Sequence, residues 1–239
     1  MREFIVQAVK LQLDEKFLTP KLLNAFERGT YEKAEATQLA RIIKDGDRIL
    51  ELGGGVGFLS SLASKLVKVA HCTVVEANPD LIPVIKETHR INSVTANVVM
   101  GVAASRRSKL DLPISEKGEV PFYQREHFWG SSLDGSWRYQ SVVNVPVLDL
   151  QAIMDTADPT ILLVDIEGGE LNIFDRIDLT SVRHAVMEVH KSAIGLEGVN
   201  KVVQVFYREG LYLDPDGTNG AVFMFSRPQD TSVRTSTKV

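Results

Sequence analysis

A strand, a glycine-rich turn and a helix follow one another within residues 49–60 of this sequence. The apolar run of residues 49–52 breaks into glycines and resumes as a helical pattern, which predicts the first strand-helix unit of an α/β sheet. Glu51 precedes three glycines at alternate positions, Gly53, Gly55 and Gly57. Glycines in such a turn permit positive φ and let a ligand approach the backbone, so the turn predicts a ligand site.

The spacing of these glycines argues against a dinucleotide ligand. A dinucleotide-binding turn reads G-x-G-x-x-G, and Phe58 stands where its third glycine would be. The carboxylate of Glu51 would also repel a pyrophosphate, whereas it suits a cationic or amine-bearing ligand. The turn is therefore not typical of an NAD site.

A second acid lies at the end of the next predicted strand. Residues 71–76 end in Glu76, 25 positions after Glu51. An acid at this distance is placed to accept hydrogen bonds from ribose hydroxyls. Glu76 alone would be interpreted as a solvated residue at a strand end, but together with the glycine turn it predicts a ribose contact.

Strands and helices alternate along the rest of the chain. We expect strands at residues 48–52, 71–76, 96–102, 141–147, 160–165 and 182–189, and helices at residues 58–66, 79–92, 149–155, 171–177 and 196–209. Residues 211–213 and 221–225 flank a turn-rich segment, which predicts a terminal antiparallel hairpin. Alternation implies parallel strands joined by right-handed crossovers, which places Glu51, Glu76 and Asp165 at one edge of the sheet.

The predicted domain occupies residues 46–226. Residues 1–45 are expected to form an N-terminal helical extension, although residues 3–13 mix helical spacing with strand alternation. Residues 104–140 form an insert rich in polar and aromatic residues, which is interpreted either as a substrate-facing segment or as a flap over a sheet edge. Residues 227–239 are polar and are expected to be flexible.

The composition excludes several classes of protein. The 239 residues are 44% hydrophobic and 24% charged, as in an ordinary globular protein, and the net charge of -4 argues against a nucleic-acid binder. Residues 1–17 contain no long apolar run, so we expect neither a signal peptide nor a membrane contact, and a cytoplasmic location. The one cysteine, Cys72, is expected to pack in the second strand. The aromatic side chains of the insert fit either a lid or a homo-oligomer contact.

Two motifs carry a resemblance to a known family. The segment from Glu51 to Gly57, with Glu76, resembles the S-adenosylmethionine site of class I methyltransferases. The run Asp165-Ile166-Glu167-Gly168-Gly169-Glu170 resembles the D-x-E-G-x-E signature of the FkbM-type methyltransferases. The resemblance implies S-adenosylmethionine as cofactor. It also implies a Rossmann-like α/β fold of the class I methyltransferase type, with a mostly parallel seven-stranded sheet, a C-terminal antiparallel hairpin and helices on both faces.

The same resemblance implies which residues hold the cofactor. They are Glu51, Gly53, Gly55, Glu76, Ala77, Asn78, Val102, Ala103 and Asp165. The first three are expected at the amino acid portion and the next three at the ribose. Val102 and Ala103 would flank the adenine, and Asp165 would face the methionine end and the transferable methyl.

Asp165 and His190 are the expected catalytic residues. Asp165 follows a buried apolar strand at the ligand edge, where a carboxylate is often functional. His190 ends the next strand, where an imidazole can take a proton from a hydroxyl, and a purely structural histidine is the alternative. Substrate contacts are expected from Glu167, Trp129 and Ser132.

The implied reaction is methyl transfer to the oxygen of a small hydroxylated acceptor, such as a sugar or a secondary metabolite. Displacement at a sulfonium depends on positioning and at most one base. We expect no obligatory metal, because no close pairing of ligands occurs among His71, His89, Glu167, Glu170 and His190. Two alternatives remain: an NAD-dependent oxidoreductase, and a cofactor-binding module of the same fold without catalysis.

Overall fold

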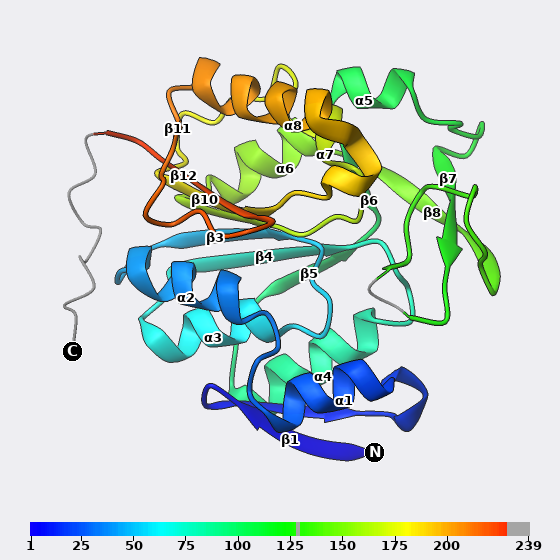
Figure 1. Cartoon of the computed structure of the whole chain (residues 1–239), viewed down its shortest axis with the longest axis vertical. Helices are drawn as coiled ribbons and strands as arrows, with labels where there is room; N and C mark the ends of the chain where they lie inside the picture. The colour runs from blue at the N-terminus through cyan, green and yellow to red at the C-terminus, as the bar shows by residue number, and fades with distance from the viewer. Residues whose placement is uncertain (128–129, 229–239) are drawn as a thin grey trace.

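A seven-stranded sheet forms the centre of the computed structural model, which describes residues 1–127 and 130–228 (Figure 1). Its strands, in spatial order, are β11 (Tyr212–Leu213), β12 (Val222–Ser226), β10 (His184–Glu188), β9 (Ile161–Val164), β3 (Arg48–Leu52), β4 (His71–Glu76) and β5 (Asn97–Met100). The strands from β10 to β5 are parallel, and β12 is antiparallel to both of its neighbours. The mostly parallel sheet and the closing hairpin are as the sequence predicts.

Helices cover both faces of this sheet. One face carries α2 (Lys33–Ile42), α3 (Phe58–Leu66) and α4 (Ile82–Asn92), and the other carries α6 (Leu150–Ala157), α7 (Glu170–Ile173) and α8 (Lys191–Arg208). Neighbouring strand residues serve opposite layers, because side chains alternate across a strand. In β3, Ile49 packs in the layer of α2 and α3, and Leu50 packs in the layer of α6 and α8. Burial on both sides is typical of a parallel sheet.

The N-terminal segment is a β-hairpin followed by helices. β1 (Arg2–Val6) pairs antiparallel with β2 (Val9–Leu13), and α1 (Pro20–Glu27) and α2 follow. The helical extension predicted for residues 1–45 is therefore wrong for residues 2–13. Alternate side chains of the hairpin are buried, and the Lys10 backbone exchanges hydrogen bonds of 3.0 and 2.7 Å with the Asn92 side chain of α4. These contacts favour the strand alternation over the helical spacing.

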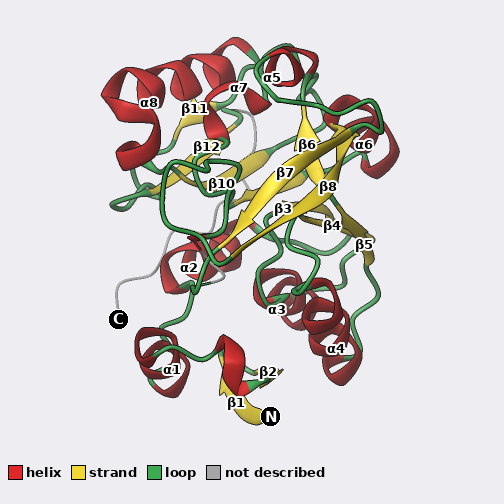
Figure 2. Ribbon diagram, turned by 90° about the vertical axis from the view of Figure 1, so that its right-hand side faces the viewer, coloured by secondary structure: helices red, strands yellow, loops and turns green. Residues whose placement is uncertain are grey.

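The insert builds a second sheet beside the first (Figure 2). β6 (Val102–Ala104), β8 (Ser141–Asp149) and β7 (Glu119–Gln124) form it in this order, with α5 (Arg106–Leu110) between β6 and β7. The strand predicted at residues 96–102 is divided at Gly101, which has φ of 149°. The strand predicted at residues 141–147 belongs to this small sheet and not to the central one. Val120, Phe122 and Val145 form its core.

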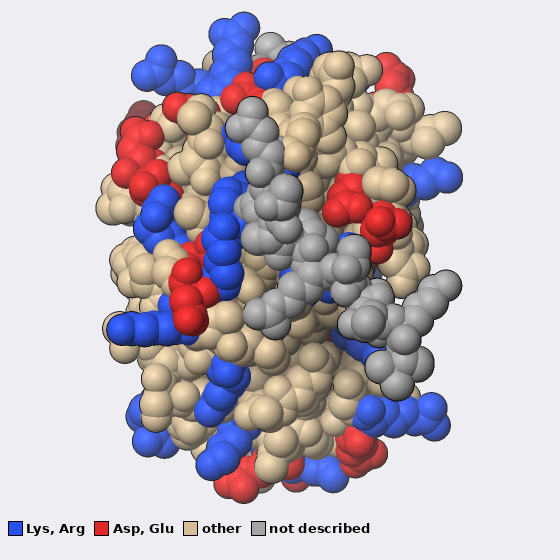
Figure 3. All heavy atoms as spheres, turned by 90° about the vertical axis from the view of Figure 1, so that its left-hand side faces the viewer, with Lys and Arg blue, Asp and Glu red and all other residues tan. Residues whose placement is uncertain are grey.

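Charged side chains of both signs are interspersed on the face that Figure 3 shows. Among the described residues, no helix has the length and apolar character needed to cross a membrane. The tail predicted to be flexible lies outside the described residues from position 229 onward.

Asp47 joins three strands at the edge of the sheet opposite the glycine turn. It is 2% exposed, and its carboxylate accepts hydrogen bonds from the Lys44 amide at 2.9 Å, the Thr160 hydroxyl at 2.7 Å and the Arg183 guanidinium at 2.8 Å. Lys44, Thr160 and Arg183 precede β3, β9 and β10 respectively. One carboxylate therefore fixes the starts of three adjacent parallel strands.

Asp47→Asn should lower the free energy of unfolding by about 3–5 kcal/mol, because it breaks a buried ion pair. The matched control is Glu87→Gln, which removes a solvent-screened pair with Arg90 and should leave the stability close to that of the wild type. Urea unfolding followed by circular dichroism measures both variants. Equal losses of stability would contradict the role of Asp47.

Candidate active site

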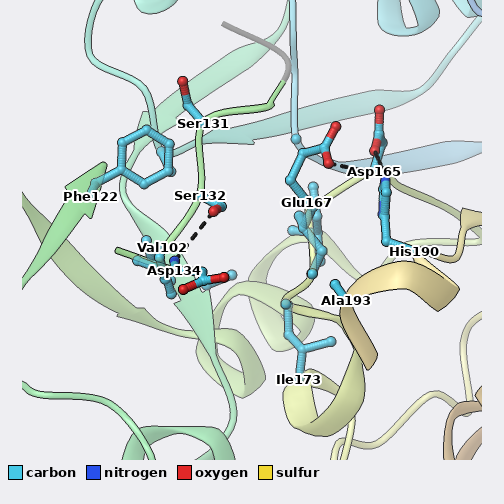
Figure 4. A pocket seen from close by; sticks show the side chains of 18 of the residues that line it. Val102, Phe122, Ser131, Ser132, Asp134, Asp165, Glu167, Ile173, His190 and Ala193 are labelled. Atoms are coloured by element: carbon cyan, nitrogen blue, oxygen red, sulfur yellow. Dashed lines mark hydrogen bonds and ion pairs between the residues drawn. The ribbon is translucent and has the colours of Figure 1, made fainter. Parts of the chain in front are cut away.

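A cavity of about 850 Å³ lies at the carboxyl ends of β3, β4, β9 and β10, and residues of the insert form its opposite wall (Figure 4). This volume falls within the usual range of small-molecule sites. Most of the residues predicted from the sequence line it: Gly53, Gly55, Glu76, Ala77, Val102, Ala103, Ser132, Asp165, Glu167 and His190. Ligand binding at this edge is what a parallel sheet predicts.

The glycine turn offers bare backbone to the cavity. Gly53 has φ of 86°, and a Cβ atom there would lie 1.7 Å from the carbonyl oxygen of Asp165. Gly55 has φ of 52°, and a Cβ atom there would lie 3.2 Å from the hydroxyl of Tyr31. Neither position accepts a side chain without displacing its neighbours, so both require glycine, and both lie on the cavity lining.

Glu76, the last residue of β4, is held in place by backbone donors. Its Oε2 accepts a hydrogen bond from the Gly55 amide at 3.0 Å, and its Oε1 accepts one from the Asn78 amide at 2.7 Å. Burial raises the pKa of Glu76, and the backbone hydrogen bonds oppose that rise. Each carboxylate oxygen has a second lone pair, so Glu76 can still accept hydrogen bonds from a ligand in the cavity.

Glu51, which the sequence predicts at the amino acid portion of the cofactor, lies outside the described lining of this cavity. It shares the α2 side of β3 with Ile49, because the two side chains are two residues apart. It is 2% exposed and lines a separate cavity of about 10 Å³, together with Glu32 and Asp165. Burial, and then the charge of Glu76, raises the pKa of Glu51 to about 8 against the opposing hydrogen bond to Ser60.

Asn78 and Trp129 are two further predicted residues without a place in the described lining. The Asn78 side chain is turned to the insert, where its Oδ1 accepts a hydrogen bond from Gln124 Nε2 at 2.9 Å. Asn78 therefore supports Glu76 through its backbone amide and does not face the cavity. Trp129 lies outside the described residues.

Carboxylates gather around the ring of His190. Nδ1 of the ring forms a short hydrogen bond with Oε1 of Glu170. Nε2 lies 3.2 Å from Oε2 of Glu167, 3.9 Å from Oδ1 of Asp165 and 4.0 Å from Oε1 of Glu188. Figure 4 shows Asp165, Glu167 and His190 together on one side of the cavity, with Ser131 and Ser132 across from them. The structure thus brings the predicted pair, Asp165 and His190, together.

The pKa values of His190 and Asp165 are shifted by burial and by the neighbouring carboxylates. Burial alone would lower the pKa of His190, but the hydrogen bond to Glu170 and the charge of Glu167 outweigh it and raise the pKa to about 9. Burial, and then the charges of Glu188 and Glu167, raises the pKa of Asp165 well above its usual value. With only these carboxylates around it, the ring of His190 is favoured in its protonated form, which is not the free base that the sequence suggests. A bound cation in place of the proton would leave the lone pair of Nε2 available.

The insert supplies a buried polar wall. Ser131 and Ser132 are each 7% exposed, and Ser132 Oγ accepts a hydrogen bond from the Asp134 amide at 3.3 Å. Arg125 also lines the cavity and donates to the carbonyl oxygens of Gly130 and Asp134. The sequence carries no signal for Arg125, because its place depends on how the insert folds.

Tyr31 and Glu32 close the cavity beside the glycine turn. From the sequence, Glu32 is expected on a solvated helix face, with a role at the cofactor as the weaker alternative. The structure instead places both residues on the cavity lining, with Glu32 accepting a hydrogen bond from Tyr31. Glu32 has φ of 44°, an unusual value for a residue with a side chain, at the start of α2.

The sheet order, the glycine turn after β3 and the acid that ends β4 define a Rossmann-like fold of the class I methyltransferase type. The model of the methyltransferase FkbM domain matches residues 51–212, and the chain belongs to this family. The matched part contains the glycine turn, Glu76, the insert and the whole cluster around His190.

Known proteins similar to the chain include other methyltransferases. The ribosomal protein L11 methyltransferase of Acetivibrio thermocellus is 31% identical over 115 residues, which are 43% of this chain and 36% of that protein. The chain thus matches about a third of the length of this curated relative. The precorrin-6Y C5,15-methyltransferase of Geobacter metallireducens has a TM-score of 0.48 at 14% identity, covering 91% of this chain and 94% of that chain. M. jannaschii TYW2 in complex with AdoMet has a TM-score of 0.44 at 12% identity, covering 92% and 83%.

Gly53→Ala should lower the free energy of unfolding by about 3 kcal/mol or more. The new Cβ atom collides with the Asp165 backbone, and the φ of this position is unfavourable for alanine. Gly46→Ala is the matched control. Gly46 has φ of 84° and open space around its Cβ position, so only the backbone cost of about 1 kcal/mol applies. Urea unfolding compares the two, and equal losses would contradict the close contact at Gly53.

Proposed function

We propose that the protein transfers the methyl group of S-adenosylmethionine to a hydroxyl oxygen of a small acceptor, such as a sugar or a secondary metabolite. One observation carries the proposal. A single cavity combines a glycine turn backed by Glu76 with the cluster around Asp165 and His190. Family membership supplies the reaction class, and the proposal adds the cofactor, the acceptor atom and the residue roles.

The residues on the β4 side of the cavity fit S-adenosylmethionine. Gly53 and Gly55 leave the turn free of side chains, and Glu76 keeps lone pairs for the ribose hydroxyls. Val102 and Ala103 add small apolar side chains to the lining, a surface that suits a flat base. These five residues are the proposed cradle, with Ala77 beside Glu76.

The acidic residues suit the positively charged end of this cofactor. The backbone of Asp165 lies directly beside the glycine turn, and Glu167 lines the same side of the cavity. Glu51 and Glu32 lie behind the turn in the small cavity, which has room for about one water molecule. We propose that the cationic cofactor favours the charged form of Glu51, which then acts on the amino acid portion through its field, or through a water molecule, and not by direct contact.

When bound, S-adenosylmethionine supplies an electrophilic methyl group on a cationic sulfur. The task of the chain is then to hold an acceptor hydroxyl in line and to receive its proton. Asp165 is the proposed receiver, because it lines the cavity and its Oδ1 has no hydrogen-bond partner among the described residues. The cationic cofactor favours its ionised form, and its raised pKa makes that form the stronger base. The ion pair between His190 and Glu167 holds these two side chains in place beside the Asp165 carboxylate.

The wall across from Asp165 supports a hydroxylated acceptor. Ser132 contributes a hydroxyl group, and Phe122 contributes the face of an apolar ring. Such a mixture suits a ring that carries several hydroxyl groups.

The NAD-dependent alternative has less support. Phe58, which replaces the third glycine of a dinucleotide turn, is fully buried at the start of α3. A binding module without catalysis differs from the proposal in turnover alone, which the acceptor experiment below measures.

Glu76→Ala should weaken S-adenosylmethionine binding by about 10- to 100-fold, because two hydrogen bonds to a charged group are lost. Calorimetric titration with S-adenosylmethionine and S-adenosylhomocysteine, and with NADH for comparison, measures this loss. Glu76→Gln should lose less, since one acceptor oxygen remains. Glu87→Ala, an exposed glutamate of α4, is the control and should bind as the wild type does. Unchanged affinity in Glu76→Ala would remove Glu76 from the ribose site.

Asp165→Asn should lower kcat by about 100-fold or more while changing cofactor affinity by only a few fold, because the proton receiver is lost and the cradle is not. A panel of glycosides, phenols and amines with methyl-labelled cofactor identifies the acceptor, and mass spectrometry with NMR identifies the methylated atom. Asp155→Asn, which changes an exposed carboxylate of α6, is the control. Methylation at nitrogen, or an active Asp165→Asn variant, would overturn the proposal.

A further inference from the structure

Three side chains with metal-binding atoms meet at the ends of two neighbouring strands. Asp165 follows β9, Glu188 ends β10, and His190 lies two residues later. One ligand atom from each lies within 4.8 Å of the other two. The pairing of Val164 with Met187 in the sheet sets the two strand ends side by side, so the cluster rests on a rigid part of the fold.

The separations within the cluster fit ligands of a shared ion better than hydrogen bonds. Nε2 of His190 lies 3.9 Å from Oδ1 of Asp165 and 4.0 Å from Oε1 of Glu188, beyond hydrogen-bond range. Two metal bonds of about 2.1 Å each can span such a gap, and imidazole and carboxylate ligands both form bonds of that length.

The ring of His190 is oriented as a metal ligand requires. Its Nδ1 is occupied by Glu170, a carboxylate that is 1% exposed, and this leaves Nε2 facing Glu167 at 3.2 Å, with Asp165 and Glu188 at 3.9 and 4.0 Å. Metal-binding histidines commonly hold their other ring nitrogen on a buried carboxylate in this way.

A second, independent observation is that a carboxylate oxygen of the site is buried without a hydrogen-bond partner. Among the described residues, Oδ1 of Asp165 is buried without a hydrogen bond, and so is Oε2 of the buried Glu170. Buried polar atoms without partners are rare and call for an explanation. Arg125, a cation on the same lining, donates to the carbonyl oxygens of Gly130 and Asp134, and its charge lowers the pKa of Glu167 less than that of His190 does.

We propose that Asp165, Glu188 and His190 bind a divalent metal ion, with Glu167 beside it. A mixed set of imidazole and carboxylate ligands suits an ion such as Mn²⁺, Fe²⁺ or Zn²⁺. Asp165 and His190 line the large cavity, so the open positions of the ion face it. Those positions take oxygen atoms of the acceptor, which makes a neutral molecule with adjacent hydroxyl groups the favoured substrate class. Only this last step rests on the proposed function.

The direct test is a titration of the full chain with Mn²⁺ after treatment with a chelator. The electron paramagnetic resonance signal of free Mn²⁺ measures how much of the ion is bound. We expect saturable binding of one ion per chain, weakened at least tenfold in Glu188→Gln and in His190→Ala. Circular dichroism confirms folding, and Glu188→Gln keeps the shape of its side chain. Glu197→Gln, an exposed position of α8, is the matched control and should bind Mn²⁺ as the wild type does.

The same preparation separates this inference from the proposed function. Glu76→Ala should lose affinity for S-adenosylmethionine and keep its affinity for Mn²⁺, whereas Glu188→Gln should show the reverse. Absence of saturable Mn²⁺ binding, or binding that both Glu188→Gln and His190→Ala leave unchanged, would overturn the metal site. If the wild-type protein does not bind S-adenosylmethionine, the proposed function is overturned and the result for Mn²⁺ still stands.

Discussion

The close approach of β3 to β9 at Gly53 is the contact on which the site depends. Leu52 pairs with Val164, and the Asp165 amide donates to the Leu52 carbonyl at 2.9 Å, so the two strands leave the sheet together. The carbonyl oxygen of Asp165 then occupies the space that a side chain at position 53 would need. The glycine turn and the start of the D-x-E-G-x-E segment therefore form one rigid unit. Whatever binds the turn is set at a fixed distance from the cluster around His190.

Electrostatics at this unit is dominated by buried carboxylates. Burying a charge is costly unless it is paired or hydrogen-bonded, and the buried acids meet this demand differently. Glu76 has two backbone amides, and Glu170 has the ring of His190. Glu51 keeps one oxygen without a partner among the described residues, and its pKa rises to about 8 instead. Acids whose pKa is raised by burial and by one another are thus built into the fold, and a cationic ligand beside them favours their charged forms. This is the common physical reason behind the proposed cofactor and the proposed metal ion.

Local patterns allowed much of the fold to be predicted, and tertiary contacts explain the rest. The bounds of β3, α3 and β4 are those expected from hydrophobic periodicity, because each element is strongly patterned and ends at glycine or polar residues. In residues 3–13 two periodicities compete, and contact with Asn92 of α4 decides for strands. The strand at residues 141–147 was predicted, but its sheet was not. Its partners are β6 and β7, and no local signal in the sequence names a strand's partner.

For the site, too, the sequence predicts which residues lie at strand ends, but not which side chains they contact. Asp165, Glu76 and His190 could be placed in one site because the carboxyl ends of parallel strands share an edge. The proposed metal site could not, since the meeting of Asp165, Glu188 and His190 depends on the register between β9 and β10. Nor could the partner of Asn78, because Gln124 comes from a strand of the insert that is 46 residues away.

The contact between Gln124 and Asn78 connects the insert to the β4 side of the cavity. Gln124 donates to Asn78 at 2.9 Å and to Asp80 at 3.1 Å, while the Asn78 amide holds Glu76 at 2.7 Å. The insert that forms the acceptor wall is therefore tied to the loop that fixes Glu76. A change in the insert that moves Gln124 must also disturb the Glu76 carboxylate. Under the proposed function, substitutions that alter acceptor choice and leave the cofactor site intact are therefore expected in the part of the insert beyond this contact, around Ser131 and Ser132.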